Sequence, residues 1–100
     1  MTQFKELDPI LHSQLRLAIV SLLINVESAE FNWLLEKTGA TNGNLSIQIS
    51  KLKEKGYIDV NKSFRNNYPL TSCSITKKGL EAFNNYINAL SGYFKRGDES

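Results

Sequence analysis

Residues 31–60 read FNWLLEKTGATNGNLSIQISKLKEKGYIDV, and this stretch decides the fold class. Apolar side chains recur at helical spacing on both sides of Gly39, which predicts a short helix ending there and a second helix beyond it. Thr41 is a suitable N-cap for the second helix, at about residues 41–55, and Gly56 ends it. Its inward-facing residues are Leu45, Ile49 and Leu52. Two helices joined by so short a turn predict a helix-turn-helix.

Another helix is predicted before this pair. It opens at Asp8-Pro9, a capping residue followed by the proline that suits a first helical turn, and runs to about Asn25. Ser28 is the predicted start of the first helix of the pair, with Phe31 as its apolar staple. Three helices therefore make up the predicted core.

After the helix-turn-helix, the apolar pattern becomes that of a β-hairpin. Apolar residues at 57–60 and 70–75 flank a polar stretch at 65–69, which predicts two strands with a ragged tip. Thr76 caps a final helix that continues through Tyr93 or beyond. The expected fold class is α+β and mostly helical, a winged helix-turn-helix with a three-helix core, a β-hairpin wing and a C-terminal helix.

The composition is that of one globular domain. The chain has 100 residues, of which 41% are hydrophobic and 22% are charged. We expect residues 1–96 to form the domain and residues 97–100 a loose polar tail. No apolar run is long enough to span a bilayer and the amino terminus lacks the pattern of a signal peptide, so a cytoplasmic protein is expected.

Charge is unevenly distributed along the chain. The net charge of +2 is too small to indicate nucleic-acid binding by itself. Residues 1–40 carry three Lys or Arg against five Asp or Glu, whereas residues 41–100 carry nine against five. The positive excess therefore lies with the second helix of the pair and the predicted wing.

The sequence offers little for catalysis or metal binding. His12 is the only histidine and Cys73 the only cysteine, so neither a closed metal site nor a disulfide can form within one chain. No glycine-rich phosphate loop follows a strand, and no nucleophile has a base at a diagnostic spacing. We therefore predict no enzyme, no cofactor and no metal, with His12 at a surface or interface and Cys73 in the core.

The outward face of the helix at about 41–55 has the chemistry of a surface that reads DNA. Its residues are Asn44, Ser46, Ile47, Ser50, Lys51 and Glu54. Asparagine bonds an adenine edge, serine meets a base or a phosphate, and lysine neutralises phosphate. Ile47 either contacts a thymine methyl group or is an ordinary exposed apolar residue.

Two neighbouring regions each allow two interpretations. Thr41 and Asn42, at the start of the helix, either hold a DNA phosphate or only cap the helix. The wing, at about residues 62–69, either follows the DNA backbone or minor groove or is a solvated loop. Its candidate contacts are Lys62, Arg65 and Asn66.

The first and last helices each carry two apolar stripes. Those of the last helix are Leu80, Phe83, Ile87, Leu90 and Phe94 on one side, and Ala82, Tyr86, Ala89 and Tyr93 on the neighbouring side. Either one stripe completes the core while the other packs against a second copy, or both form one wide stripe in a single core. The predicted homodimer interface comprises Ile10, Leu17, Val20, Tyr86, Ala89 and Tyr93.

At this point the chain resembles the winged-helix DNA-binding proteins related to the MarR and ArsR groups of transcriptional regulators. The matching stretches are LDPILHSQLRLAIVSLL, FNWLLEKTGATNGNLSIQISKLKEKGYIDV and SITKKGLEAFNNYINAL, at residues 7–23, 31–60 and 74–90. The resemblance implies a homodimer on a pseudo-palindromic site with half-sites about one helical turn apart. It points to DNA contacts by Arg16, Thr41, Asn42, Asn44, Ser46, Ile47, Lys51 and Arg65.

The sequence departs from the pattern of these families in two ways. Gln48 stands in the recognition helix where related sequences often have histidine, and the difference bears on base preference. One cysteine and one histidine do not supply the ligand cluster that metal sensing of the ArsR type needs. Whether a small-molecule effector exists is left open.

The sequence leaves two hypotheses for the function. The favoured hypothesis is a sequence-specific regulator that binds double-stranded DNA, with the helix at about 41–55 in the major groove and the wing on the backbone or minor groove. The alternative is a winged-helix adaptor that binds another protein and has no specific DNA site.

Overall fold

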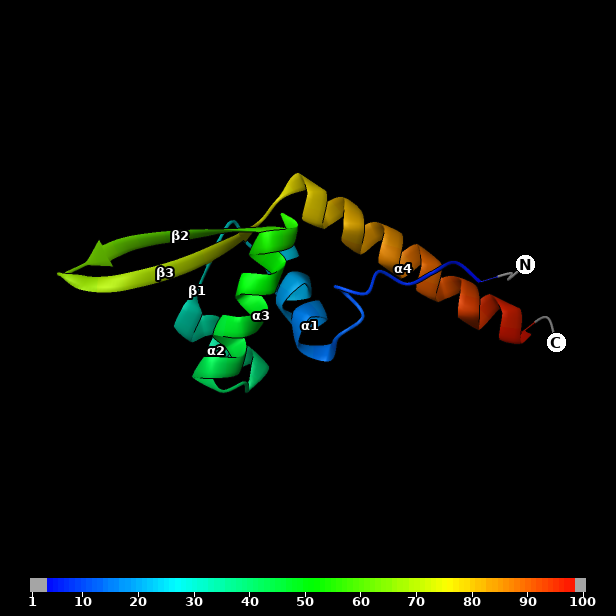
Figure 1. Ribbon diagram of the computed structural model, residues 1–100, viewed down its shortest axis with the longest axis horizontal. Coiled ribbons are helices and arrows are strands. Elements are labelled where there is room, and N and C mark those ends of the chain that lie inside the picture. Colours follow the sequence, from blue (N-terminus) through cyan, green and yellow to red (C-terminus); the bar gives the residue numbers. More distant parts are fainter. Residues whose placement is uncertain (1–3, 99–100) are drawn as a thin grey trace.

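The computed structural model describes residues 4–98, including the side chains of residues 4–95. Its elements are α1 (Gln14–Ile24), β1 (Ala29–Glu30), α2 (Phe31–Thr38), α3 (Asn42–Lys55), β2 (Ile58–Arg65), β3 (Tyr68–Ile75) and α4 (Lys77–Asp98). The first three helices form a compact body, from which the β2–β3 wing extends in one direction and α4 in the other (Figure 1). The molecule is accordingly elongated, with extents of 59 × 25 × 21 Å. The predicted winged helix-turn-helix is confirmed.

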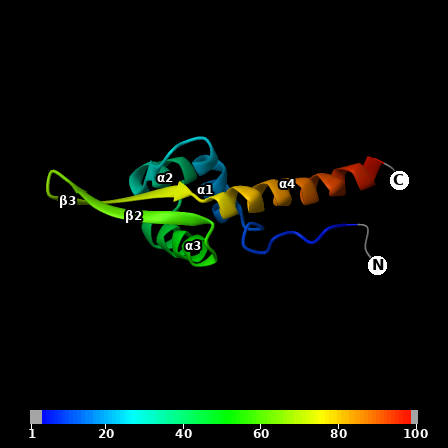
Figure 2. The same cartoon turned by 90° about the horizontal axis from the view of Figure 1, so that it is seen from above.

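A short strand that the sequence pattern did not predict completes the sheet. β1 pairs with β3 in antiparallel register, Ala29 opposite Cys73, so the strand order is β1-β3-β2. Figure 2 shows β2 and β3 side by side in the wing, at the opposite end of the molecule from α4. Because Ala29 and Glu30 are held in this extended pairing, α2 begins only at Phe31, with Glu30 at its N-cap. Ser28 is therefore not the helix cap that the sequence predicted.

α1 begins later than predicted, at Gln14. Asp8 does act as a local cap, because its Oδ1 accepts hydrogen bonds from the backbone N–H groups of Ile10 at 2.8 Å and Leu11 at 3.4 Å. These bonds close a separate turn before the helix. Ser13 then has an extended backbone, with φ −152° and ψ 127°, and it separates this turn from the regular helix.

The predicted boundaries of α3 are confirmed by its caps. Thr41 Oγ1 accepts a hydrogen bond from the Asn44 N–H at 3.2 Å. Gly39 and Gly56, at the ends of α2 and α3, have φ values of 71° and 84°, the left-handed conformation that glycine adopts without a steric cost. The short join between the two helices follows from these residues.

The wing ends in a tight turn rather than in the predicted ragged tip. Asn66 and Asn67 both have positive φ, 52° and 68°, which is the requirement of a two-residue type I′ turn. Asparagine tolerates this conformation better than other residues with a side chain. The strands therefore stay paired to the end, with Arg65 opposite Tyr68.

The start of α4 is fixed on the end of α3 by a close backbone contact. Thr76 Oγ1 caps α4 by accepting from the Gly79 N–H at 3.0 Å, and it donates to the Gly56 carbonyl at 2.6 Å. Gly79 lies so near Tyr57 that an added Cβ would be 2.1 Å from the Tyr57 carbonyl oxygen. The Tyr57 hydroxyl in turn donates to Asp8 Oδ2, and burial together with this bond raises its pKa to about 12, so Tyr57 remains the donor.

The packing of α4 corrects the predicted interface. Tyr86 and Ala89 are buried within their own chain, as is Val20 of α1, so these three side chains are not available to a second copy. Tyr86 also shares a hydrogen bond with the exposed His12 at 3.0 Å. Tyr93 stacks on Phe4 and donates to the Lys5 carbonyl. This stripe of α4 therefore faces the N-terminal part of the same chain, and Ile10 and Leu17 are half-buried against the core.

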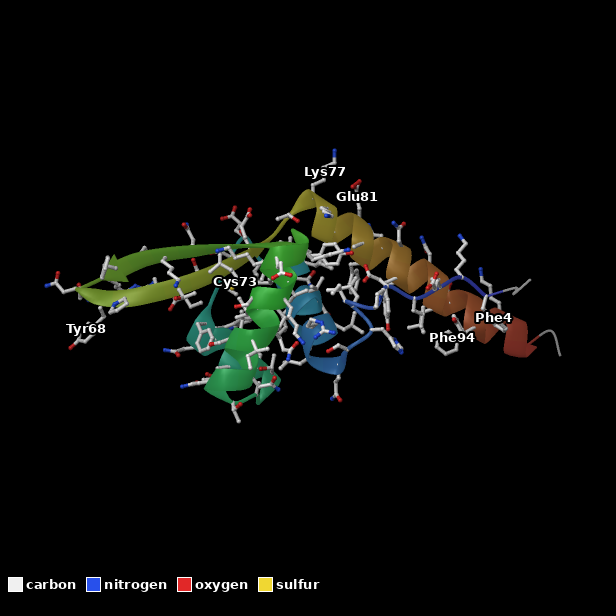
Figure 3. The ribbon with its side chains drawn as sticks, in the orientation of Figure 1. Phe4, Tyr68, Cys73, Lys77, Glu81 and Phe94 are labelled. Carbon is white, nitrogen blue, oxygen red and sulfur yellow. The ribbon has the colours of Figure 1, made fainter. Side chains whose placement is uncertain are left out.

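The neighbouring stripe of α4 is only partly covered, because Phe83 and Leu90 are half-buried against the core while the other members are exposed. Leu80, Ile87 and Phe94 are 40%, 41% and 68% exposed. Phe94 lies on the part of α4 that extends beyond the three-helix body (Figure 3). The helix continues to Asp98, so the tail predicted from residue 97 overlaps it by two residues, and residues 99–100 lie outside the described part of the chain.

Candidate nucleic-acid interface

α3 brings the residues predicted to contact DNA together on its exposed surface. Leu45, Ile49 and Leu52 are buried in the core, as the helical spacing predicts. The residues exposed on the remaining surface of α3 and its N-cap include Thr41, Asn42, Asn44, Ser46, Ile47, Ser50 and Lys51. Ile47 is 55% exposed, so an apolar side chain stands in the middle of a polar surface.

A groove runs between α3 and the wing. It has a volume of about 390 Å³ and is lined by Phe31, Ser46, Ile49, Ser50, Lys53, Val60, Lys62 and Thr71. Two ammonium groups and two serine hydroxyls border it, which is a donor set suited to a phosphate. Lys62, Ser46 and Ser50 were predicted from the sequence. Lys53 was missed because it lies on the flank of α3, where only the position of the wing shows that it belongs to the site.

The two faces of the wing differ in chemistry. Side chains alternate between faces along a strand, so Phe64 and its cross-strand partner Pro69 continue the face that carries Lys62. Arg65 and Tyr68 belong to the opposite face. Phe64 and Tyr68 are almost equally exposed, at 76% and 75%, and Tyr68 lies at the far end of the wing (Figure 3).

Arg65 is engaged within the protein. Its guanidinium forms an ion pair with Glu30 of β1 at 2.8 Å, and both side chains are well exposed. An exposed pair of this kind contributes about 0–1 kcal/mol, so a stronger partner displaces it readily. Asn66 lies in the turn, beside Arg65. The structure thus brings Lys62, but not Arg65, to the face of the wing that borders α3.

Arg16 is also committed to its own chain. Its Nε donates to the Ile10 carbonyl at 2.6 Å and its Nη1 to Gln48 Oε1 at 2.5 Å. Gln48 Nε2 in turn donates to Asn44 Oδ1 at 2.9 Å. Arg16 therefore connects α1 to the exposed face of α3. Gln48 was not among the predicted site residues, although its position one turn after Asn44 was a signal that the two amides meet.

Comparison with known proteins decides the family. A model of the winged helix DNA-binding domain matches residues 15–94, which include α1 to α3, the wing and most of α4. The chain belongs to this winged helix DNA-binding domain family. The uncharacterized protein MJ0432 of Methanocaldococcus jannaschii is 42% identical over 78 residues, covering 78% of this chain and 85% of that protein.

Solved structures agree with this assignment. A transcriptional regulator homologue from Pyrococcus horikoshii superposes with a TM-score of 0.82 at 27% identity, covering 89% of this chain and 88% of the other. PadR of Bacillus subtilis, solved in complex with operator DNA, has the same fold, with a TM-score of 0.67 at 14% identity over 75% of this chain and 48% of its own. The structural neighbours are regulators of the MarR and PadR kind.

The structure also bears on metal binding, thiol chemistry and membrane insertion. Within residues 4–98, no three His, Cys, Asp or Glu side chains come together as a metal site. Cys73 is buried in the core, and burial raises the pKa of its thiol to about 11, which keeps the thiol protonated and unreactive. None of the helices in that range combines the length and apolar character needed to cross a membrane.

Proposed function

We propose that this winged helix domain is a sequence-specific regulator of transcription that inserts α3 into the major groove of double-stranded DNA. The observation that carries the proposal is the groove between α3 and the wing, where Lys53 and Lys62 lie beside the exposed polar face of α3. A helix fits the major groove, and lysines at its flank meet the phosphates that border that groove. Regulators with this fold, PadR with its operator among them, support the assignment.

The other predicted contacts have defined parts in this arrangement. Thr41 and Asn42 lie at the N-terminus of α3, where backbone N–H groups and the helix dipole favour a phosphate. Ser46 and Ser50 line the groove between α3 and the wing, and Ile47 and Lys51 are exposed beside them on α3. Arg65 is paired with Glu30 on the face of the wing turned away from α3 and Asn66 lies in the turn beside it, so Lys62 rather than Arg65 is the phosphate contact proposed for the wing. A protein with this function acts where the DNA is, inside the cell.

We further propose that the active form is a homodimer joined through the exposed stripe of α4. Its exposed members are Leu80, Ile87 and Phe94, and the half-buried Phe83 and Leu90 lie between them at alternating steps of three and four residues. This heptad spacing is the pattern of a seam between two helices, and a second copy of α4 supplies a matching seam. Two copies related by a two-fold axis would read a two-fold symmetric site.

The experiment that tests the proposal is selection of bound sequences from a randomised duplex pool, followed by titration of the selected duplexes. We expect a two-fold symmetric site to bind at least about a thousandfold more tightly than random duplex at moderate salt. Uniformly weak binding would instead favour the protein-interaction adaptor, for which the exposed Ile47 in the middle of α3 is the supporting observation.

Removing either lysine of the groove should weaken DNA binding and its dependence on salt. Each phosphate contact releases about one counterion, so Lys53→Ala and Lys62→Ala should each lower the slope of log affinity against log salt by about one. Titrations by fluorescence anisotropy at several salt concentrations measure this slope. Lys95→Ala, at an exposed position near the far end of α4, is the matched control and should leave the slope unchanged.

Phe64 and Tyr68, two exposed aromatic residues near the wing tip, provide a second test of DNA binding and its control. Phe64 lies on the face of the wing that borders α3, and apolar side chains in such positions enter the minor groove. Phe64→Ala should therefore weaken binding to the selected site about tenfold. Tyr68→Ala removes an equally exposed aromatic ring from the opposite face and should have less than about a twofold effect. Equal losses in both variants would contradict the assignment of faces.

A further inference from the structure

Three side chains linked by hydrogen bonds determine which way the Asn44 amide points on the exposed face of α3. Arg16 Nη1 donates to Gln48 Oε1 at 2.5 Å, and Gln48 Nε2 donates to Asn44 Oδ1 at 2.9 Å. A guanidinium has N–H donors and no acceptor, so Gln48 must turn its oxygen toward Arg16. Its NH₂ group then faces Asn44, and since NH₂ only donates, Asn44 must turn its oxygen toward Gln48.

Arg16, the first of the three residues, is held in place by further hydrogen bonds. Arg16 also donates to two backbone carbonyls of the turn before α1, that of Ile10 at 2.6 Å and that of Pro9 at 3.5 Å. Arg16 and Gln48 are both half-buried, whereas Asn44 is exposed. Arg16 therefore fixes the orientation of the Gln48 amide, Gln48 fixes that of the Asn44 amide, and Asn44 presents its Nδ2 donor at the surface.

We propose that Arg16, acting through Gln48, makes Asn44 a hydrogen-bond donor toward the major groove and so directs α3 to a base that carries acceptors there. Guanine with O6 and N7, or thymine with O4, presents only acceptors there, adenine has its N7 acceptor beside an N6 donor, and cytosine presents only its N4 donor. The sequence alone pointed to adenine, which an asparagine reads with its oxygen and its nitrogen together. The inference rests on the proposed function. Arg16 and Gln48 are positioning residues, and Asn44 is the contact.

The test is the isosteric variant Gln48→Glu. A carboxylate accepts from Arg16 in a charge-assisted bond and cannot donate, so Asn44 must turn its Nδ2 inward and its oxygen outward. Selection from a randomised duplex pool, with the original protein and the variant in parallel, reads the base preference at each position. At one position of each half-site, we expect the ratio of guanine or thymine to cytosine to fall at least about fivefold in the variant.

Two controls separate base preference from affinity and from folding. Lys51→Gln makes the same change in net charge on the same helix, and it should weaken binding while leaving every base preference as it was. Asn44→Ala alters only an exposed side chain. It should abolish discrimination at the very position that Gln48→Glu inverts.

The outcomes distinguish this inference from the function on which it rests. If the original protein selects a specific site and Gln48→Glu selects the same base at every position, the inference is overturned and the proposed function stands. A preference that survives Asn44→Ala unchanged overturns it as well, even if Gln48→Glu does not fold. If the original protein selects no sequence, the proposed function fails and the inference fails with it.

Discussion

Gly79→Ala should lower the free energy of unfolding by about 3 kcal/mol or more. The added Cβ would lie 2.1 Å from the Tyr57 carbonyl oxygen, which is far inside van der Waals contact. That carbonyl also accepts a hydrogen bond from the Thr76 N–H at 3.1 Å, so α4 cannot move away without losing its connection to the end of α3. Urea denaturation followed by far-UV circular dichroism measures the change.

Gly92→Ala is the matched control on the same helix. Gly92 lies within α4, and nothing lies within 4 Å of the position that its Cβ would occupy. Alanine is a better helix former than glycine, so this variant should gain about 0.5–1 kcal/mol. Opposite signs at Gly79 and Gly92 are the expected result. An unchanged urea midpoint for Gly79→Ala would show that the close contact with Tyr57 does not constrain the fold.

Ile87→Glu should convert a dimer into monomers and remove most of the affinity for a two-fold symmetric DNA site. Ile87 is the central residue of the exposed α4 stripe, between Leu80 and Phe94. A carboxylate there would be buried without a partner when two stripes meet, and that cost opposes association. Loss of the second half-site contact lowers affinity by about a hundredfold or more, because the two contacts no longer act together.

Sedimentation and DNA titration, carried out on the same preparations, measure both parts of this prediction. Asn88→Glu makes the same charge change at the next residue, which is exposed and lies outside the stripe, so the dimer should persist. The Ile87→Glu monomer should still bind a single half-site weakly, since α3 and the wing are untouched. A dimer that persists in Ile87→Glu would mean that the two copies meet elsewhere.

The local sequence was sufficient to predict the structure wherever a single residue type forces one backbone conformation. Thr41 and Gly56 set the ends of α3, and Thr76 caps α4, because capping hydroxyls and left-handed glycines act over three or four residues. The inward stripe of α3 followed in the same way from the helical period. The fold class and the exposed face of α3 could therefore be predicted from the sequence.

Tertiary structure decided what depends on contacts between distant segments. β1 exists only because β3 pairs with it, and this pairing delays the start of α2 beyond Ser28. The same holds for α4, since both of its stripes have a helical period and only packing against the N-terminal segment buries Tyr86 and leaves Ile87 exposed.

The features of the candidate site can likewise be separated into those set by the sequence and those set by the tertiary structure. The sequence determined that α3 carries small polar side chains and that the positive charge lies beyond residue 40, since these are properties of the residues themselves. The tertiary structure alone brought Lys53 to the wing, paired Arg65 with Glu30 and connected Arg16 through Gln48 to Asn44. The partners in each of these contacts come from different elements, so neither periodicity nor local propensity records them. Their geometry is fixed only when the core closes and holds α1, α3 and the wing together.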